Sequence, residues 1–234
     1  MKRYVLSYWF VFLVVTGLTL ATLHWEVPGL DGMAGAADLA GAGKLDLSNR
    51  NLTRFPSEVL SRKNLTSLNL SGNKMKTLPA EIGNLSNLEE LFIDDNQLQG
   101  AIPAEIRKLR KLRILSLKHN DMTGIPAEIG QLGRLQALDY SFNRLDTMPN
   151  EIRNMRSLKK LSLAHNRYRE FPREMWQIPN LEYLDLSHND LSSLPDEISQ
   201  LRKLKVLKLT GNKIAVKDLE RIRRLLPSAQ VVNT

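Results

Sequence analysis

The sequence has no cysteine, few aromatic residues and only four histidines, and these shortages exclude several kinds of site and partner. Without cysteine it forms no disulfide bond and no thiolate metal site, and it is not a bacterial lipoprotein, which needs a lipidated cysteine. Aromatic residues make up 6% of the chain and do not interleave with the basic residues, so we expect no nucleic-acid partner. Acidic residues are also in deficit, with 25 against 33 lysines and arginines, which gives a formal net charge of +8.

Internal repetition is what the sequence has in abundance. The segments "LNLSGNKMKTLP" (68–79), "LSLKHNDMTGIP" (115–126), "LSLAHNRYREFP" (161–172) and "LDLSHNDLSSLP" (184–195) share one pattern that recurs in steps of 23 residues. The unit at 91–103 carries one extra residue, which predicts a local bulge. In each unit leucines alternate with other residues, as in a half-buried strand, and a proline then precedes a short helical run. Stacked units would bury their leucines together in one continuous core.

The full pattern, L-x-x-L-x-L-x-x-N-x-L-x-x-L-P-x-E-I-x-x-L-x-x, resembles the leucine-rich repeat. Its "LPxEIxxL" half is similar to the 23-residue subclass of Ras-group adaptor proteins and bacterial leucine-rich repeat proteins. The resemblance implies an α/β fold, a right-handed solenoid or horseshoe of about eight turns with a parallel concave sheet and short helices on the convex side. It also implies that one asparagine per turn hydrogen-bonds backbone groups of its own turn and of the turn beside it. These asparagines are Asn73, Asn96, Asn120, Asn143, Asn166, Asn189 and Asn212.

The two ends of the chain depart from the repeat. Residues 1–25 open with two basic residues and about 20 mostly apolar ones, which predicts a cleaved signal peptide or a retained N-terminal hydrophobic helix that anchors the chain in a membrane. The basic start places the repeats on the extracytoplasmic side, so the chain is expected to be exported, either anchored or secreted. Residues 26–41 form a Gly- and Ala-rich spacer, residues 42–214 the repeats and residues 215–234 a C-terminal cap. Uniform repeats without cysteine-bridged caps are typical of a bacterial protein.

The positive charge concentrates in the run "RKLRKLR" (107–113) and at other basic residues on the expected convex helices. A solvated surface that keeps the protein soluble is the plainer explanation. The alternative is attraction to an anionic surface, such as phospholipid headgroups or an acidic envelope polymer.

Three of the four histidines share one repeat position, directly before the asparagine. His165 and His188 lie in adjacent turns, so we expect their side chains within several ångströms of each other. One interpretation is that these two imidazoles, with Asp185 nearby, bind a transition metal weakly. Histidine is common at this position in the family, however, so we favour structural filling and expect no cofactor and no resident metal. No nucleophile is positioned by a third group, and the repeats occupy nearly the whole folded length, so we expect no enzyme.

The residues that alternate with the leucines should form the concave surface, which the resemblance implies is the binding surface. These positions vary in type from turn to turn, whereas the core positions do not. Their aromatic members and the charged residues around them are of the kinds that anchor and orient interfaces. We predict a partner-binding surface made of Glu90, Phe92, Asp94, Lys118, Asp139, Phe142, Lys160, His165, Tyr183, Asp185 and His188.

Together these features favour a monomeric, non-catalytic protein-binding module displayed outside the cytoplasmic membrane, which recognises a protein partner through its concave sheet. The alternative is an envelope-associated structural protein, held to anionic polymer or lipid by its basic convex face.

Overall fold

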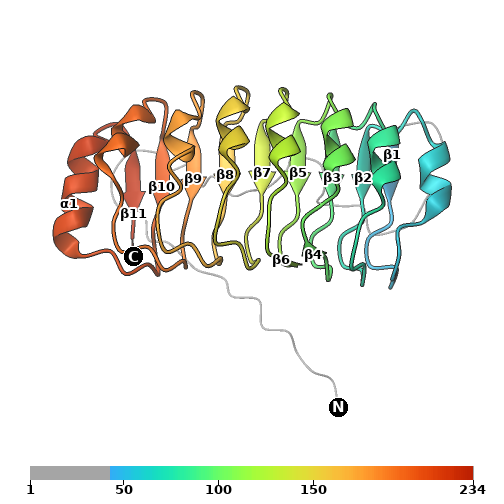
Figure 1. Cartoon of the computed structure of the whole chain (residues 1–234), viewed down its shortest axis with the longest axis horizontal. Coiled ribbons are helices and arrows are strands. Elements are labelled where there is room, and N and C mark those ends of the chain that lie inside the picture. The colour runs from blue at the N-terminus through green and yellow to red at the C-terminus, as the bar shows by residue number, and fades with distance from the viewer. Residues whose placement is uncertain (1–42, 234) are drawn as a thin grey trace, which may run out of the picture. The chain divides into compact units, whose positions relative to one another are not determined.

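The computed structural model describes residues 43–233, and a parallel sheet of nine strands runs through them (Figure 1). Each strand pairs only with its neighbours in the row, because the chain advances by one strand per repeat. In spatial order the strands are β1 (Lys44–Asp46), β2 (Ser67–Asn69), β3 (Glu90–Phe92), β5 (Ile114–Ser116), β7 (Ala137–Asp139), β8 (Lys160–Ser162), β9 (Tyr183–Asp185), β10 (Val206–Lys208) and β11 (Gln230–Val232).

The strands pair in a register that places equivalent repeat positions side by side. Leu91 of β3 lies opposite Leu68 of β2 on one side and Leu115 of β5 on the other. All three leucines are fully buried, and the residues on either side of them in each strand point to the opposite face. The predicted parallel sheet and continuous leucine core are confirmed.

Each proline of the repeat precedes a short helix, as predicted, but the helices are of the 3-10 type. The Pro79 carbonyl accepts a hydrogen bond from the Ile82 amide at 3.1 Å, which closes the tight first turn. Neighbouring helices approach so closely that a Cβ atom on Gly130 would lie 2.2 Å from the carbonyl oxygen of Glu151. The helices are η1 (Ser57–Ser61), η2 (Ala80–Asn84), η3 (Ala104–Lys108), η4 (Ala127–Gln131), η5 (Asn150–Asn154), η6 (Met175–Gln177) and η7 (Asp196–Gln200).

The repeat asparagines hold the chain where it leaves the sheet. The Asn143 Oδ1 atom accepts a hydrogen bond from the Met122 amide at 3.0 Å, and its Nδ2 atom donates to the carbonyls of Leu117 and Tyr140, each at 3.0 Å. Met122 and Leu117 belong to the preceding turn, whereas Tyr140 belongs to the same turn. The expectation that this asparagine bonds its own turn and an adjacent one is therefore confirmed.

The unit with the extra residue, at 91–103, also contains β4 (Gln99–Gly100). This strand pairs in parallel with β6 (Asp121–Met122) and forms a separate two-stranded sheet with it. Gly100 has a φ of 67°, a left-handed conformation that glycine adopts without the steric cost of a Cβ atom.

Beyond the last repeat, α1 (Val216–Leu225) covers the end of the core with Leu219 and Ile222. The chain then returns to the sheet, where Val231 of β11 lies opposite Leu207 of β10. Among residues 43–233, no helix is both long and apolar enough to span a membrane. The hydrophobic segment expected to be a signal peptide or anchor (1–25) and the spacer after it (26–41) lie outside the described residues.

Candidate functional site

The surface that the sheet presents away from the leucines is called here the sheet face. It consists, in each repeat, of the first and third residues of the strand and the second and third residues after it. The last of these positions, directly before the repeat asparagine, has a positive φ in every repeat, between 51° and 74°. Glycine adopts this left-handed conformation freely, and asparagine, aspartate and histidine adopt it more readily than other residues do. The residues at this position are Asn49, Gly72, Asp95, His119, Phe142, His165, His188 and Gly211.

The backbone conformation explains why histidine recurs at this position, and it also brings the rings together. His119, Phe142, His165 and His188 form one row, called here the ring strip. The Phe142 ring lies 4.0 Å from that of His119 and 3.9 Å from that of His165, centroid to centroid. The rings of His165 and His188 are stacked at 4.1 Å with an interplanar angle of 15°, so the expected proximity of these two histidines is confirmed.

Gly211 occupies the next place in the row and lets the His188 ring extend over it. A Cβ atom on Gly211 would lie 2.4 Å from the His188 Nδ1 atom, which is too close for any side chain. At the other end of the strip, the His119 Nδ1 atom lies 3.1 Å from the Asp95 carboxylate. Burial and the neighbouring His188 lower the pKa of His165, so the middle of the strip favours the neutral imidazole.

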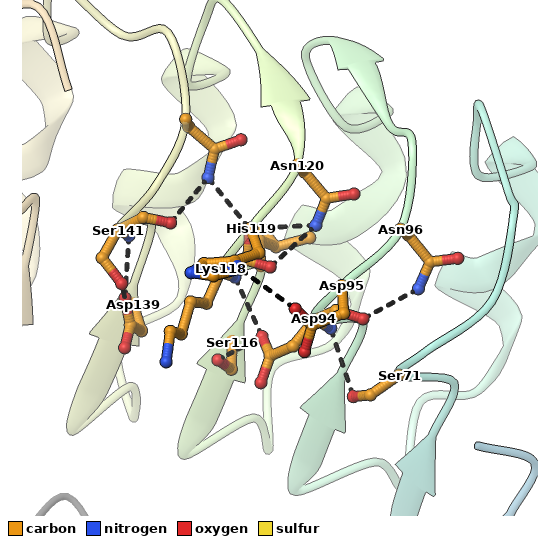
Figure 2. Close-up of polar contacts among 12 residues, drawn as sticks. Ser71, Asp94, Asp95, Asn96, Ser116, Lys118, His119, Asn120, Asp139 and Ser141 are labelled. Atoms are coloured by element: carbon orange, nitrogen blue, oxygen red, sulfur yellow. Dashed lines mark hydrogen bonds and ion pairs between the residues drawn. The ribbon is translucent and has the colours of Figure 1, made fainter. Parts of the chain in front are cut away.

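Asp94 lies beside the strip on the sheet face (Figure 2). Its Oδ1 atom accepts hydrogen bonds from the Ser116 hydroxyl at 2.6 Å and from the Lys118 amide at 2.9 Å. Burial raises the pKa of this carboxyl to about 6, despite the two hydrogen bonds, which act in the opposite direction. A carboxylate with such a pKa changes its charge close to physiological pH.

Asp139 and Asp185 have a local structural role that the sequence analysis did not recognise. Asp139 accepts hydrogen bonds from the Ser141 amide at 2.8 Å and the Ser141 hydroxyl at 2.6 Å, which fixes the chain at the end of β7. Asp185 accepts one from the Ser187 amide at 3.0 Å. The signal was present in the sequence, because Asp-x-Ser recurs at this point of several repeats and suits a turn in which the aspartate bonds its own backbone.

Tyr183 and Lys208 complete this end of the sheet face. The Tyr183 hydroxyl donates a hydrogen bond to Asp185 at 3.1 Å, and the Lys208 Nζ atom lies 5.4 Å from the centre of the Tyr183 ring. The same lysine is 3.6 Å from the Asp185 carboxylate. Burial and the adjacent Asp185 raise the pKa of Tyr183, so its hydroxyl stays protonated at neutral pH.

The predicted surface residues differ in how much of them a partner can reach. Phe142 is 37% exposed, as expected of an anchor, and its ring lies 5.5 Å from the Lys118 Nζ atom. Phe92 was expected on the surface and is only 5% exposed, and Asp139 is equally covered. Alternation along a strand predicts the face to which a residue points but not how its neighbours cover it. Glu90 and Lys160 are half-buried on the same face.

No group of three or more histidine, aspartate or glutamate side chains within residues 43–233 is arranged to hold a metal ion. The two adjacent imidazoles are stacked ring on ring, and the geometry between them is that of packing.

Comparison with known proteins agrees with this repeating architecture. One leucine-rich repeat family model matches residues 43–98 and 156–214, and a leucine-rich repeat region model matches residues 95–175. The chain belongs to the leucine-rich repeat proteins. The matches extend continuously over the repeats and do not distinguish the 23-residue subclass.

Solved structures of other leucine-rich repeat proteins are similar to this one. A leucine-rich repeat protein of Leptospira interrogans is 36% identical with a TM-score of 0.66, over 80% of this chain and 54% of the other. The ectodomain of the Arabidopsis thaliana receptor kinase GASSHO1/SCHENGEN3, in complex with CASPARIAN STRIP INTEGRITY FACTOR 2, is 28% identical with a TM-score of 0.66, over 81% and 24%. Internalin C2 of Listeria monocytogenes has a TM-score of 0.70 at 23% identity, over 82% and 80% of the chains, which shows the fold alone.

This leucine-rich repeat protein therefore spans about half of the Leptospira structure and a quarter of the receptor ectodomain. No curated protein matches the sequence.

Proposed function

We propose that the chain is a non-catalytic protein-binding module that recognises its partner through the sheet face. One observation carries this proposal. Phe142 is a large apolar side chain, 37% exposed, at a position whose left-handed backbone suits glycine or asparagine. Holding a bulky residue there costs on the order of 1–2 kcal/mol, and the contacts of its ring with His119 and His165 do no more than offset this strain. Contact with a partner accounts for such a residue, because exposed aromatic rings commonly supply much of the binding energy of an interface.

The neighbours of Phe142 support the same surface. His119 and His165 flank its ring within 4.0 Å, and Lys118 lies above it, so the anchor is held rigidly before any partner arrives. Tyr183 presents a second aromatic side chain on the same face. Rigid aromatic groups lose little conformational entropy on binding, which favours affinity. The receptor ectodomain described above, which was solved with its partner bound, supports a protein as the ligand.

The test is affinity capture from a cell-envelope extract at pH 7.5, with the full chain in mild detergent as bait. The double variant Phe142→Asn, Tyr183→Ser should capture at least about tenfold less of any specific partner, in line with the loss of an aromatic anchor. The matched control is Gln131→Ser, Arg153→Ser, which changes two exposed residues on the helices. Equal capture by the sheet-face variant and the wild type would refute this surface, and loss confined to the control would place binding on the helices.

We further propose that the module is displayed outside the cytoplasmic membrane, because its first 25 residues combine a basic start with a long apolar run. Protease added to intact cells should degrade the repeats, while a cytoplasmic marker survives. The intact mass of the mature chain would then separate a cleaved signal from a retained anchor.

A second candidate function is attachment to an anionic envelope surface. The exposed basic side chains of Lys108, the last residue of η3, and of Arg110 favour it. Binding to vesicles rich in phosphatidylglycerol should then weaken steeply with added salt and with the variant Lys108→Glu, Arg110→Glu. Salt-independent binding, or none above that to phosphatidylcholine vesicles, would contradict it.

A further inference from the structure

The sheet face has a charge opposite in sign to that of the molecule. Its positions carry six carboxylates and four lysines, whereas the whole chain has a formal net charge of +8. This face therefore carries an excess of acid, whereas the rest of the chain taken together carries an excess of base. The carboxylates are Asp46, Glu90, Asp94, Asp95, Asp139 and Asp185, and the lysines are Lys44, Lys118, Lys160 and Lys208.

The histidines of the sheet face are gathered in its middle. The three histidines of the ring strip make contact directly or through Phe142, with centroid distances between 3.9 and 4.1 Å. Histidine is the side chain whose charge ordinarily changes between pH 5 and 8. Because stacked rings stand so close, a proton on one of them acts directly on the next.

Charged side chains from the adjoining repeats lie close to His119 and His165. The Asp95 carboxylate, which follows β3, lies 3.1 Å from the Nδ1 atom of His119. Burial, together with the neighbouring His188 and Lys118, disfavours a proton on His165, whereas Asp185 of β9 favours one. His188 has the His165 ring on one side and Gly211 on the other.

Asp94 and Asp139 add two carboxyl groups whose protons are taken up at higher pH than those of exposed aspartates. Asp94 has a pKa of about 6 and is flanked by Ser116, Lys118, Asp95 and Asp139. Burial also raises the pKa of Asp139, which lies near Lys118 and Asp185. A proton gained by either carboxyl removes a negative charge, and a proton gained by a histidine adds a positive one. Every one of these groups therefore changes the charge of the sheet face in the same direction as the pH falls.

We propose that the sheet face binds a lysine- or arginine-bearing segment of its partner protein at neutral pH and releases it under mildly acidic conditions. The inference rests on the proposed function, since it names the charge of the partner and the regulation of the same surface. The acidic excess of this face on a basic molecule selects the basic segment. The ring strip and the adjoining carboxyl groups together reverse that excess on acidification.

The probes are two short fluorescein-labelled peptides, one alternating lysine with serine and the other alternating glutamate with serine. Fluorescence anisotropy with the full chain in mild detergent, at a constant ionic strength of 0.15 M, gives the affinities at pH 7.5 and 5.5. The lysine peptide should bind about tenfold more weakly at pH 5.5, since a few like charges within several ångströms of the site account for such a factor. The glutamate peptide should show the opposite change, and circular dichroism should confirm that the fold is intact at both pH values.

Two variants separate the contributions. The triple variant His119→Asn, His165→Asn, His188→Asn keeps a residue that tolerates the left-handed backbone, as Asn49 does in the first repeat. The ratio of its affinities for the lysine peptide at pH 7.5 and pH 5.5 should be much closer to one than that of the wild type. Asp94→Asn preserves the acceptor for Ser116 and Lys118 while removing the charge, so it should weaken binding at pH 7.5 and flatten the pH dependence. The control Glu105→Gln, on a helix, should behave as the wild type does.

The inference is overturned if the lysine peptide fails to bind at pH 7.5, or if its affinity differs by less than twofold between the two pH values. An unchanged pH dependence in both variants would also overturn it. Failure of the proposed function looks different: capture of the natural partner would then be insensitive to Phe142→Asn, Tyr183→Ser at any pH.

Discussion

Two adjacent positions of the repeat follow opposite rules. The first position holds asparagine in every repeat from Asn73 to Asn212. Its side chain bonds the backbone of two adjacent turns, as in Asn96, Asn143 and Asn212. The position directly before it carries asparagine, glycine, aspartate, histidine or phenylalanine, all with positive φ. One position is constrained by its side-chain hydrogen bonds, and the other only by its backbone conformation.

The asparagine position is therefore needed for the fold, whereas the residue before it can vary without loss of the fold. Any residue that tolerates a left-handed backbone satisfies the second position, and Asn49 and Gly211 do so at the two ends. The middle repeats place rings there instead, including Phe142, which tolerates that backbone poorly. Folding does not require this choice, so the variation at this position is where a partner-specific surface can be encoded. Four substitutions test the contrast, from the largest expected effect to the smallest.

Asn143→Ala should cause the largest loss of stability, about 3–5 kcal/mol, because it leaves the buried Met122 amide and the carbonyls of Leu117 and Tyr140 without their partner. Urea unfolding at pH 7.5, followed by circular dichroism, measures it. The control is Asn87→Ala, whose side chain donates to the Lys63 carbonyl at the surface and should contribute less than about 1 kcal/mol. A loss for Asn143→Ala as small as that of the control would remove the distinction between the two positions.

Asp94→Asn should stabilise the fold by about 3 kcal/mol at neutral pH and leave it unchanged near pH 4. The pKa of Asp94 is raised to about 6 in the folded chain, so between pH 4 and 6 the folded state binds more protons than the unfolded state. Stability therefore falls as the pH rises through this window and stays lower above it. The asparagine removes the buried charge and keeps an acceptor for Ser116 and Lys118.

The difference in unfolding free energy between Asp94→Asn and the wild type, measured in urea from pH 4 to 8, should grow with pH and level off above 6. A constant difference would mean that the carboxyl is not the titrating group. If Asp94→Asn gains stability and loses peptide binding, then Asp94 contributes to binding while it lowers the free energy of unfolding.

Tyr140→Phe should stabilise the protein by about 1 kcal/mol, because the buried Tyr140 hydroxyl has no hydrogen-bond partner within the described residues. Tyr168→Phe is the matched control from the next repeat and should destabilise by a similar amount, since its hydroxyl donates to the Thr147 carbonyl at 3.0 Å. The two variants remove the same atom from equally buried rings. Opposite signs in thermal unfolding are expected, and a loss in both would show that Tyr140 has a polar contact after all.

The repeating architecture could be predicted from the sequence, because the 23-residue period sets the positions of the strands, the buried leucines and the helical segments together. Leu68, Leu91 and Leu115 align in the structure as the spacing requires. The spacing did not predict that the helices are 3-10, because their apolar residues lie three apart in either helix type.

Prediction of the surface was less complete, for physical reasons. Alternation predicted the correct face of the sheet for Phe92 and Asp139 but not the extent of their burial, because burial depends on the packing of neighbouring side chains. The proximity of His165 and His188 could be predicted from their shared repeat position, whereas the stacking of their rings could not. The positive φ that explains the whole position was detectable only in its preference for asparagine, glycine, aspartate and histidine.

Phe142→Asn should change stability least, by less than about 1 kcal/mol. Asparagine relieves the strain of a bulky residue at a φ of 55°, worth about 1–2 kcal/mol, but it loses the contacts with His119 and His165, which are worth a similar amount. Phe142→Ala loses the same contacts and keeps most of the strain, so it should be less stable than Phe142→Asn by about 1 kcal/mol. Thermal unfolding of the two variants beside the wild type measures both differences. A large loss for Phe142→Asn would make the ring a part of the fold, and its exposure on the sheet face would then no longer point to a partner.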